Sequence, residues 1–509
     1  MNEQQGNLQK AYEDVPYPGV SDPWSHIRCL EALARLHGMQ PADVTACRVL
    51  ELGCASARNL LAPAAEFPNS HFIGVDFSAE QIRAGRSFAA QLSIENLELR
   101  HGRIEEIDVS WGQFDYILCP GVFSWVASET RRRILDICRE NLAPHGVAAI
   151  SYNAYPGWHF RRVARDLMRY HIAPFSDRQR QITEARSVLS FAADNCPAES
   201  PQGRVLRRER DYLRAAGNHY LFHDYLAEEN CPLYFHEFVA LAGEHELKFL
   251  CDADHSKMSG AFTSLEVQKV IANTPLVQRC QLLDYLRNES FHCSLVAHNQ
   301  IDVQYNWNST AVENFCVALT DRPSWSEVEI AGGTAIQLQF PQGNITVHHP
   351  LGKAIFRHLI SIYPAAVSFD QLCESIAPPP TTDMAAEQVA SLADALLAAF
   401  RAGLLRLYLH PPAFSREVGQ YPRVTRLNRL YASQGAVLTN GLHEDVMLDE
   451  RQSFLLSRLD GAQDRAALSE ALLQATRAGQ LIDTDRQGTI VEEVDAALAD
   501  FRKRLLLVD

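Results

Sequence analysis

The sequence predicts an α/β protein that begins with a doubly wound, Rossmann-like parallel sheet. Short apolar or β-branched runs alternate with amphipathic segments over the first 160 residues, as right-handed strand–helix–strand crossovers require. After about residue 300, proline-rich stretches at 377–380 and 410–414 separate shorter strand and helix patterns. Because prolines interrupt regular structure, this change predicts small, winged-helix-like α+β domains in the C-terminal part.

Five strands and three helices are expected in the N-terminal part. Ser78 and Ser128 are expected to cap the second and third helices, because a serine hydroxyl accepts a hydrogen bond from the first helical turn. The expected strands are residues 48–52, 71–76, 97–101, 114–120 and 146–153, and the expected helices are 57–67, 78–92 and 128–142.

The segments that follow are harder to place. Residues 160–202 predict an arginine-rich helical insertion or lid, and 234–254 a helix leading into a late strand near 245–255 that could join the first sheet. Residues 275–296 predict a helix followed by an extended run. A weak repeat relates 396–409 to 497–509, in each case a helix feeding a strand. Two tandem helix-plus-wing units would explain this repeat, and so would a chance match of amphipathic helices.

Charge and composition limit the partners. With 47 basic and 62 acidic residues the net charge is −15, which argues against broad binding to nucleic acids or anionic membranes and favours a basic or neutral partner. The N-terminus lacks a signal-peptide pattern, so we expect a cytoplasmic protein. The apolar segment 389–400 contains Asp394 and is expected to form a core helix rather than a membrane span.

The cysteines predict no metal or redox chemistry. The chain holds 12 cysteines, but none of them forms a C-x-x-C pair, the spacing typical of zinc and dithiol sites. We therefore expect buried free thiols and no bound metal.

The segment RVLELGCASARNL, residues 48–60, predicts a cofactor site. Ligands of doubly wound sheets lie at the carboxyl ends of the strands, which is where Gly53 follows the first expected strand. Asp76 ends the second strand, the position of an acid that accepts hydrogen bonds from ribose hydroxyls. The alternative interpretation is a core strand that ends in a glycine turn.

The loop's single glycine distinguishes between cofactors. A dinucleotide pyrophosphate needs G-x-G-x-x-G, whereas this loop has Ala55 and Ala57 in place of further glycines. S-adenosylmethionine carries no phosphate, and Glu51-x-Gly53 followed by small residues is sufficient for it. We therefore expect S-adenosylmethionine, with a nicotinamide oxidoreductase as a disfavoured alternative.

Seven motifs extend this interpretation over most of the chain. They are AYEDVPY (11–17), RVLELGCASARNL (48–60), FIGVDFSAEQI (72–82), FDYILCPGVFSWV (114–126), SYNAYPGWH (151–159), YLFHDYL (220–226) and PLYFHEF (232–238). The motifs resemble those of class I S-adenosylmethionine-dependent methyltransferases with a methyltransferase regulatory domain. Bacterial protein-lysine methyltransferases that modify rickettsial outer-membrane proteins are among these enzymes, and residues 459–468 resemble their C-terminal winged-helix-like part.

The resemblance implies four units and a set of cofactor-binding residues. The units are a methyltransferase domain (1–200), a regulatory region (201–300) and two winged-helix-like domains (301–412 and 413–509). Asp76 would hold the ribose, and Pro120 and Gly121 would border the methyl-transfer position. The full set is Tyr12, Tyr17, Glu51, Gly53, Cys54, Ala55, Asn59, Asp76, Phe77, Gln81, Ile104, Glu105, Pro120 and Gly121.

The sequence departs from this group at Ala57 and Arg58, where glycines are usual, and at Arg103 and Pro120. If the loop is a depleted version of the group's loop, replacing Arg58 by glycine is expected to leave cofactor affinity unchanged or improved. A large loss would mean that Arg58 contacts the ligand.

Aromatic residues after the fourth and fifth strands are the candidates for an acceptor pocket. Trp125, Tyr152, Tyr155 and Trp158 follow strands that end at one sheet edge, and aromatic rings attract an ammonium or sulfonium group. His159 could take a proton or cap the next helix. Ordinary core packing remains the alternative for each aromatic residue.

Two function classes remain beside the oxidoreductase. The first is an active methyltransferase that acts on a protein lysine, as the resemblance implies, or on a small molecule or peptide. The second is a binding module that keeps the fold without catalysis. We expect a protein or peptide partner and no nucleic acid, and the sequence leaves the oligomeric state open.

Overall fold

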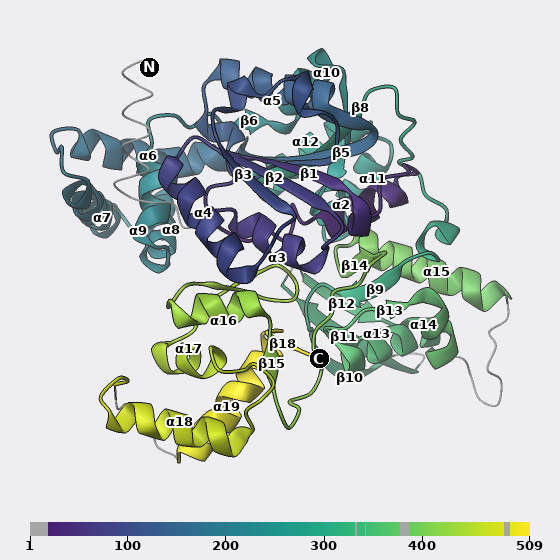
Figure 1. The fold of residues 1–509 in the computed structure, drawn as a ribbon. Helices are drawn as coiled ribbons and strands as arrows, with labels where there is room; N and C mark the ends of the chain where they lie inside the picture. The colour runs from purple at the N-terminus through teal and green to yellow at the C-terminus, as the bar shows by residue number, and fades with distance from the viewer. Residues whose placement is uncertain (1–18, 331–332, 342, 377–385, 483–488) are drawn as a thin grey trace.

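The computed structural model describes residues 19–330, 333–341, 343–376, 386–482 and 489–509. Its centre is an eight-stranded sheet in the order β3-β2-β1-β4-β5-β8-β7, with β6 paired to the end of β5 (Figure 1). The strands are β1 (Arg48–Leu52), β2 (His71–Asp76), β3 (Leu97–His101), β4 (Phe114–Cys119), β5 (Leu142–Tyr155), β6 (Leu233–Tyr234), β7 (Leu247–Asp252) and β8 (Phe291–His298).

The direction of the strands places the loops that carry the site. Neighbouring strands from β3 to β5 are parallel, and β8 runs antiparallel to both β5 and β7. The carboxyl ends of β1 to β5 therefore lie along one edge of the sheet. In β1, β2 and β4 the side chains are buried almost throughout, as expected where helices cover both faces of a parallel sheet.

Helices cover the two faces of this sheet. Apolar residues of α5 and α10 pack on one face with Leu50 and Leu52 of β1, and those of α2 and α3 pack on the other with Val49. The helices of this part are α2 (Ile27–Leu36), α3 (Arg58–Glu66), α4 (Ala79–Leu92), α5 (Ser128–Asn141), α10 (Phe235–Glu244), α11 (Leu265–Ala272) and α12 (Leu276–Arg287).

A helical insertion separates β5 from β6 and has a core of its own. Met168, Ile182, Leu206 and Tyr225 are among the buried residues of this core. The insertion comprises α6 (Gly157–Ile172), α7 (Arg178–Asn195), α8 (Pro201–Ala215), α9 (Asn218–Tyr220) and a π-helical turn (Leu221–Leu226). It projects from one side of the sheet, at the left in Figure 1.

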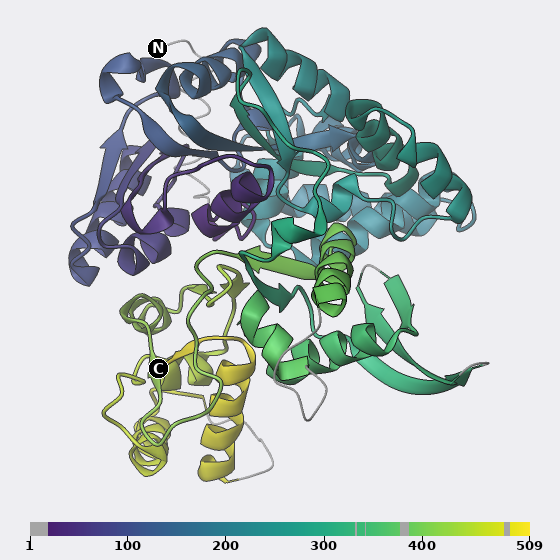
Figure 2. The same cartoon turned by 90° about the vertical axis from the view of Figure 1, so that its right-hand side faces the viewer.

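The first small domain packs beneath the sheet. It has a three-stranded sheet in the order β13-β9-β14 and a second sheet of β10, β11 and β12, which extends away from the rest of the molecule (Figure 2). Its elements are β9 (Cys316–Leu319), β10 (Ser324–Ile330), β11 (Gly333–Phe340), β12 (Gly343–Val347), α13 (Pro350–Ile362), β13 (Val367–Ser368), α14 (Phe369–Ile376), α15 (Ala386–Arg401) and β14 (Leu405–Tyr408).

The C-terminal domain packs directly on the helices beside the expected cofactor loop. Its core includes Leu61 of α3 and Ala89 and Leu92 of α4, and Figure 1 shows α16 beneath these helices. Its elements are β15 (Arg423–Val424), α16 (Arg426–Ser433), β16 (Leu438–Thr439), β17 (Asp445–Val446), α17 (Glu450–Leu456), α18 (Arg465–Arg477), α19 (Ile490–Lys503) and β18 (Leu507–Val508).

The predicted fold class is confirmed, with one correction of detail. Ser78 caps α4 as expected, but Ser128 is the first residue of α5, and Ala127 occupies the cap position without a side-chain hydrogen bond. The predicted late strand is β7, and the extended run before residue 296 is β8, inserted between β5 and β7. The sheet therefore draws its last strands from beyond residue 200.

Candidate active site

The loop after β1 turns as a glycine-rich loop would, although it holds a single glycine. Gly53 has a φ of +71°, and a Cβ at this position would lie 2.5 Å from Val122 Cγ2. Ala55 and Ala57 also adopt the left-handed region, with φ angles of +47° and +60°. Since this region costs an alanine roughly 1–2 kcal/mol, the two alanines keep the backbone path of the loop under strain.

Asp76 fastens this loop to the end of β2. Its Oδ2 accepts a hydrogen bond from the Ala55 backbone N at 2.9 Å, and its Oδ1 accepts one from Ser78 N at 2.8 Å. Burial raises the pKa of this carboxyl, against the effect of the two backbone donors. Each carboxylate oxygen has two acceptor sites, so each keeps one for a ribose hydroxyl.

Three carboxyl groups gather at this edge of the sheet. Burial is the main cause that raises the pKa of Asp22, Glu51 and Asp76, and the pKa of Glu51 reaches about 8 with the help of its two acidic neighbours. Neither Glu51 nor Asp76 forms an ion pair with another described residue. A ligand with positive charge would lower the pKa of these carboxyls, because it favours their ionised form.

Asn59, predicted to bind the cofactor, is a hub that holds Glu51. Its Nδ2 donates to Glu51 Oε2 at 3.3 Å and to Ser25 Oγ at 3.1 Å. Its Oδ1 accepts from Asp22 N at 3.0 Å and lies 2.8 Å from His443 Nε2. These four bonds use the full capacity of a side-chain amide, so Asn59 positions Glu51 and has no polar group left for a ligand.

Arg58 joins the loop to the C-terminal domain. The guanidinium donates to the carbonyl oxygens of Val437 and Leu438 at 2.5 and 3.3 Å and pairs with Asp445 at 3.0 Å. It also lies 4.8 Å from the centre of the Tyr431 ring. The expectation that glycine could replace Arg58 without loss is not supported, because this side chain docks one domain on another.

The other expected cofactor residues lie after the same strand ends. Gly121 has a φ of +65°, and its N donates to Ser151 Oγ at 2.8 Å, which connects the loop after β4 to β5. Tyr12 and Tyr17 lie outside the described residues. The residues at the edge are Cys54 after β1, Phe77 and Gln81 after β2, Ile104 and Glu105 in a turn after β3, and Pro120 and Gly121 after β4.

Comparison with known proteins identifies the fold family. Residues 43–198 match the methyltransferase domain family, residues 217–298 the predicted methyltransferase regulatory domain, and residues 420–507 the PKMT C-terminal winged helix domain. The Rickettsia prowazekii protein RP789 is 32% identical over an alignment of 508 residues, which covers 97% of this chain and 90% of that protein. The chain belongs to this family of methyltransferases.

Solved structures agree with this assignment. PKMT2 from Rickettsia typhi is 25% identical, with a TM-score of 0.84 over 97% of this chain and 100% of that chain. Its structure in complex with AdoHcy has a TM-score of 0.85. Among relatives by sequence, a second Rickettsia prowazekii protein, RP028, is 33% identical over 241 residues, which cover 47% of this chain and 96% of that protein. The predicted methyltransferase fold with regulatory and winged-helix parts is therefore confirmed.

The aromatic residues expected at the acceptor pocket of this methyltransferase fold divide into two groups. Tyr152 belongs to the core: it is 1% exposed, stacks on Phe238 at 4.3 Å and lies 3.2 Å from Ser294 Oγ through its hydroxyl. This burial corrects its place as a pocket wall, because no face of its ring is open to an acceptor.

The remaining aromatic residues gather where β5 meets α6. Trp125 and Trp158 form an edge-to-face pair at 6.2 Å, and Tyr155 and His159 stack at 4.1 Å. His159 Nε2 lies 2.9 Å from Tyr234 Oη, so its ring joins the aromatic group and does not cap α6. A cavity of about 150 Å³ opens beside Tyr155 and Trp158. Trp158 is 2% exposed and its ring contacts Arg161 and Tyr225, so it packs in the core like Tyr152. Trp125 and Tyr155 are the predicted aromatic residues that remain half-buried here, with Tyr234 as an addition.

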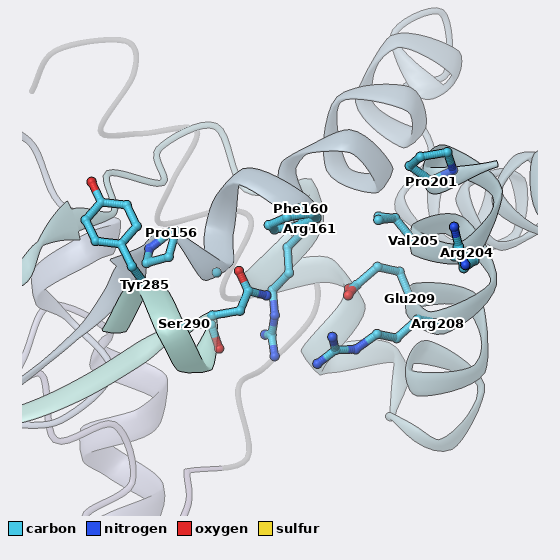
Figure 3. Close-up of a pocket in the computed structure, with 12 residues that line it drawn as sticks. Pro156, Phe160, Arg161, Pro201, Arg204, Val205, Arg208, Glu209, Tyr285 and Ser290 are labelled. Atoms are coloured by element: carbon cyan, nitrogen blue, oxygen red, sulfur yellow. The ribbon is translucent and has the colours of Figure 1, made fainter. Parts of the chain in front are cut away.

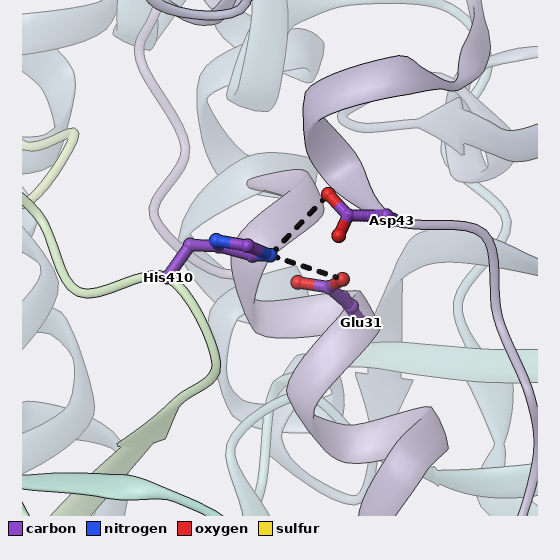
Figure 4. A group of neighbouring side chains, drawn as sticks. All are labelled: Glu31, Asp43 and His410. Carbon is purple, nitrogen blue, oxygen red and sulfur yellow. Dashed lines mark ion pairs between the residues drawn. The ribbon is translucent and has the colours of Figure 1, made fainter.

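A second polar cluster lies away from the cofactor loop. His410 Nε2 is 3.3 Å from Asp43 Oδ1 and 3.7 Å from Glu31 Oε1, and Figure 4 shows the three side chains pointing toward one another. Burial raises the pKa of Glu31 to about 7, with the imidazole opposing the shift. Sequence analysis missed this cluster because its members are far apart in the chain. The ion pairs connect α2 to the segment after β14.

One expectation about membranes was tested within the described residues. None of their helices combines the length and apolarity needed to cross a bilayer. The segment 389–400 lies in α15, whose Leu392, Leu396 and Phe400 are buried in the core.

Proposed function

We propose that this protein transfers a methyl group from S-adenosylmethionine to the side chain of a lysine in a protein or peptide. The observation that carries the proposal is the placement of Glu51, Gly53 and Asp76 at the carboxyl ends of β1 and β2. Support comes from the similarity to PKMT2, which has been solved with AdoHcy, the product that S-adenosylmethionine leaves after methyl transfer.

The residues present fit this cofactor. A β-carbon at position 53 would collide with Val122. Only glycine therefore allows the backbone to lie this close to its neighbours. The uncompensated carboxyls of Glu51 and Asp76 suit the sulfonium and ammonium charges, and the open acceptor sites of Asp76 suit the ribose hydroxyls. A dinucleotide would bring phosphates next to these carboxylates and is disfavoured.

The cofactor would supply an electrophilic methyl carbon on a sulfonium sulfur. With the cofactor bound, the lone pair of lysine Nζ would displace the sulfide leaving group in line, so the work of the protein would be alignment and exclusion of water. No covalent bond to the enzyme is needed.

The aromatic group at the start of α6 is proposed to prepare the lysine. A free lysine has a pKa near 10.4 and is protonated at neutral pH, so the amine must lose a proton before it attacks. Partial burial beside Trp125 and Tyr155 disfavours the charged form, and their ring faces guide the ammonium into place. In the tautomer in which His159 Nε2–H donates to Tyr234 Oη, the second ring nitrogen, Nδ1, can accept a proton.

The experiment that tests the proposal combines binding with transfer. Calorimetric titration with S-adenosylmethionine should show a single site, and NADH should give no heat. S-adenosylmethionine with a labelled methyl group is then incubated with a cell lysate and the protein. The label should appear on lysines, which mass spectrometry identifies. Binding without transfer would favour the alternative of a binding module that keeps the fold, and label on a small metabolite would replace lysine as the acceptor.

A further inference from the structure

A large open cavity lies beside the aromatic group, on the far side of the first turn of α6. It has a volume of about 600 Å³, a size typical of ligand-binding sites. Its walls come from α6, from α8 and from the turn between α12 and β8 (Figure 3). The apolar part of the wall includes Pro156, Phe160, Val205 and Tyr285, and Phe160 and Tyr285 are 50% and 54% exposed.

The charged part of the wall is positive. Arg161, Arg204 and Arg208 line the cavity, and Figure 3 shows Arg161 and Arg208 reaching from α6 and α8 toward one another. The one acidic residue of the lining, Glu209, is 5% exposed and accepts a hydrogen bond from the Tyr225 hydroxyl. Glu209 also interacts electrostatically with Arg161 and helps to raise the pKa of its guanidinium, so Arg204 and Arg208 are the positive groups that remain for a ligand.

Arg204 and Arg208 have no close, buried acidic partner among the described residues. Arg208 has no hydrogen bond or ion pair within the described part of the chain, and the nearest acid to Arg204 is Glu199, at 4.0 Å and almost fully exposed. Arg161 is held by ring contacts to Trp158 and Tyr212, at 5.7 and 5.3 Å, and donates to Tyr220 Oη at 3.4 Å. The cavity therefore presents the guanidinium groups of Arg204 and Arg208 beside an apolar wall.

We propose that this cavity binds an acidic stretch of the polypeptide whose lysine is methylated. The inference rests on the proposed function and adds the class of sequence that the enzyme selects. Guanidinium groups pair with carboxylates through two parallel hydrogen bonds, while Phe160 and Tyr285 offer apolar contact to neighbouring side chains. Because the net charge of −15 disfavours broad attraction of acidic chains, binding of an acidic stretch needs a local group of arginines such as this one.

The sheet order gives the spacing between the lysine and the acidic residues. Pro156 follows β5 and Ser290 precedes β8, whereas the expected methyl-transfer position at Pro120 and Gly121 follows β4. Two strand spacings separate β4 from β8, or roughly 10 Å across the sheet. Because Cys119 of β4 pairs with Ile150 of β5, Pro156 also lies about five residues, or roughly 17 Å, farther along the strand direction than Pro120. An extended peptide covers the combined distance of roughly 20 Å in about six residues, so the acidic residues selected lie about six or more positions from the lysine.

A nucleic acid fits this cavity less well than a polypeptide. Binding to a phosphate backbone needs a basic surface that runs along several phosphates, whereas here the arginines enclose one cavity in a chain of net charge −15. The apolar wall also suits amino-acid side chains better than sugar and phosphate.

The test uses the full chain and a pair of fluorescent lysine peptides that differ only in having two Glu or two Gln about six and seven residues from the lysine. The Glu peptide should bind about threefold to tenfold more tightly, as expected for one or two partly screened ion pairs, and the difference should shrink at high salt. Charge reversal in the double variant R204E and R208E should remove this preference and favour a peptide with two Lys at those positions.

Arg214 supplies the matched control. It lies on α8 but does not line the cavity, and it is 62% exposed, so R214E makes the same charge change without altering the proposed site. Equal binding of the Glu and Gln peptides, or an equal effect of R214E, would overturn the inference. Tighter binding of an oligonucleotide than of the Glu peptide would also overturn it.

Equilibrium binding separates this inference from the proposed function. If the wild-type protein binds the Glu peptide selectively but transfers no methyl to it, the lysine activity fails and the docking inference stands. If methyl transfer occurs at the same kcat/KM on both peptides, the activity stands and the docking inference fails.

Discussion

His443 of the C-terminal domain lies 2.8 Å from Asn59, 384 residues earlier in the chain, and its ring nitrogen donates to the amide oxygen. Burial, together with two nearby arginines, lowers the pKa of His443 to about 3, so this imidazole is neutral at physiological pH. Its backbone has a φ of +61°, a strained conformation for a residue with a β-carbon. The C-terminal domain thus holds Asn59, and through it Glu51, from outside the sheet.

Removing the His443 side chain should therefore weaken cofactor binding without any contact to the cofactor being lost. In H443A the Asn59 oxygen loses its buried donor, which costs roughly 1–3 kcal/mol, and part of this cost should appear as an approximately tenfold rise in Kd for S-adenosylmethionine. The measurement is calorimetric titration of wild type and variant.

Glutamine at the same position is the control for a specific role. Its amide can also donate to Asn59, so H443Q should recover most of the affinity, while an unspecific packing defect would leave both variants equally weak. Unchanged affinity in H443A would mean that Glu51 keeps its position without the C-terminal domain.

Arg58 should behave as a docking residue rather than a remnant of a glycine-rich loop. Its side chain is 8% exposed and satisfies two carbonyls and Asp445, so R58A leaves buried polar groups without partners. We expect a loss of about 2–4 kcal/mol in the stability of the interface and a lower melting temperature in calorimetry. R58K keeps the charge but not the paired geometry, so its melting temperature should lie between those of wild type and R58A.

The affinity of an R58G variant distinguishes the two interpretations of the loop. Because Arg58 begins α3 directly after the strained Ala57, release of its contacts should also loosen the loop and weaken cofactor binding. An affinity equal to or better than wild type would support the interpretation from sequence and contradict the docking role.

Asp76 should be the most sensitive residue of the cofactor site. D76A removes the acceptors of Ala55 N and Ser78 N as well as those proposed for the ribose, and we expect a loss of affinity of about 100-fold or more, as for two or more charge-assisted hydrogen bonds. D76N keeps one acceptor oxygen and should lose less.

A carboxylate at the opposite edge of the sheet provides the comparison. Asp115 accepts a hydrogen bond from Arg48 N at 2.8 Å, at the start of β1 rather than at its end. D115N should therefore alter stability without altering affinity. Equal losses of affinity in D76N and D115N would contradict the assignment of the site.

The sequence predicts the sheet and its edge better than it predicts the partners at that edge. Short apolar runs between helical segments locate β1, β2 and β3, because the pattern of each run depends on the burial of its own residues. The roles of Arg58 and Asn59 depend on β16 and β17, which lie some 380 residues away, and no local pattern encodes that contact. Tyr152 shows the same limit, since its neighbours Phe238 and Ser294 come from distant elements.

The pH dependence of cofactor binding should come from Glu51. Burial raises the pKa of this carboxyl to about 8 in the unliganded protein, so it is mostly protonated at pH 6. A cationic cofactor favours the ionised form, and binding should release a proton. The Kd for S-adenosylmethionine should then fall between pH 6 and 8, by at most tenfold per pH unit, and level off above pH 8.

The stability of the unliganded protein should change in the opposite sense. A carboxyl whose pKa is raised by folding contributes stability that is complete below its unfolded value, near 4.5, and is lost as the pH rises through about 8. The melting temperature without cofactor should therefore fall from pH 6 to pH 8, and cofactor should protect most strongly at the upper end of this range.

The variant E51Q isolates this group from the amino group of the cofactor, which also titrates near pH 8. Glutamine can still accept the hydrogen bond from Asn59, but it has no proton to release. In calorimetry with two buffers of different ionisation enthalpy, wild type should release close to one proton more than E51Q at pH 7. Equal proton release by the two proteins, or weaker binding to wild type as the pH rises from 6 to 8, would show that Glu51 does not face the positive charge of the cofactor.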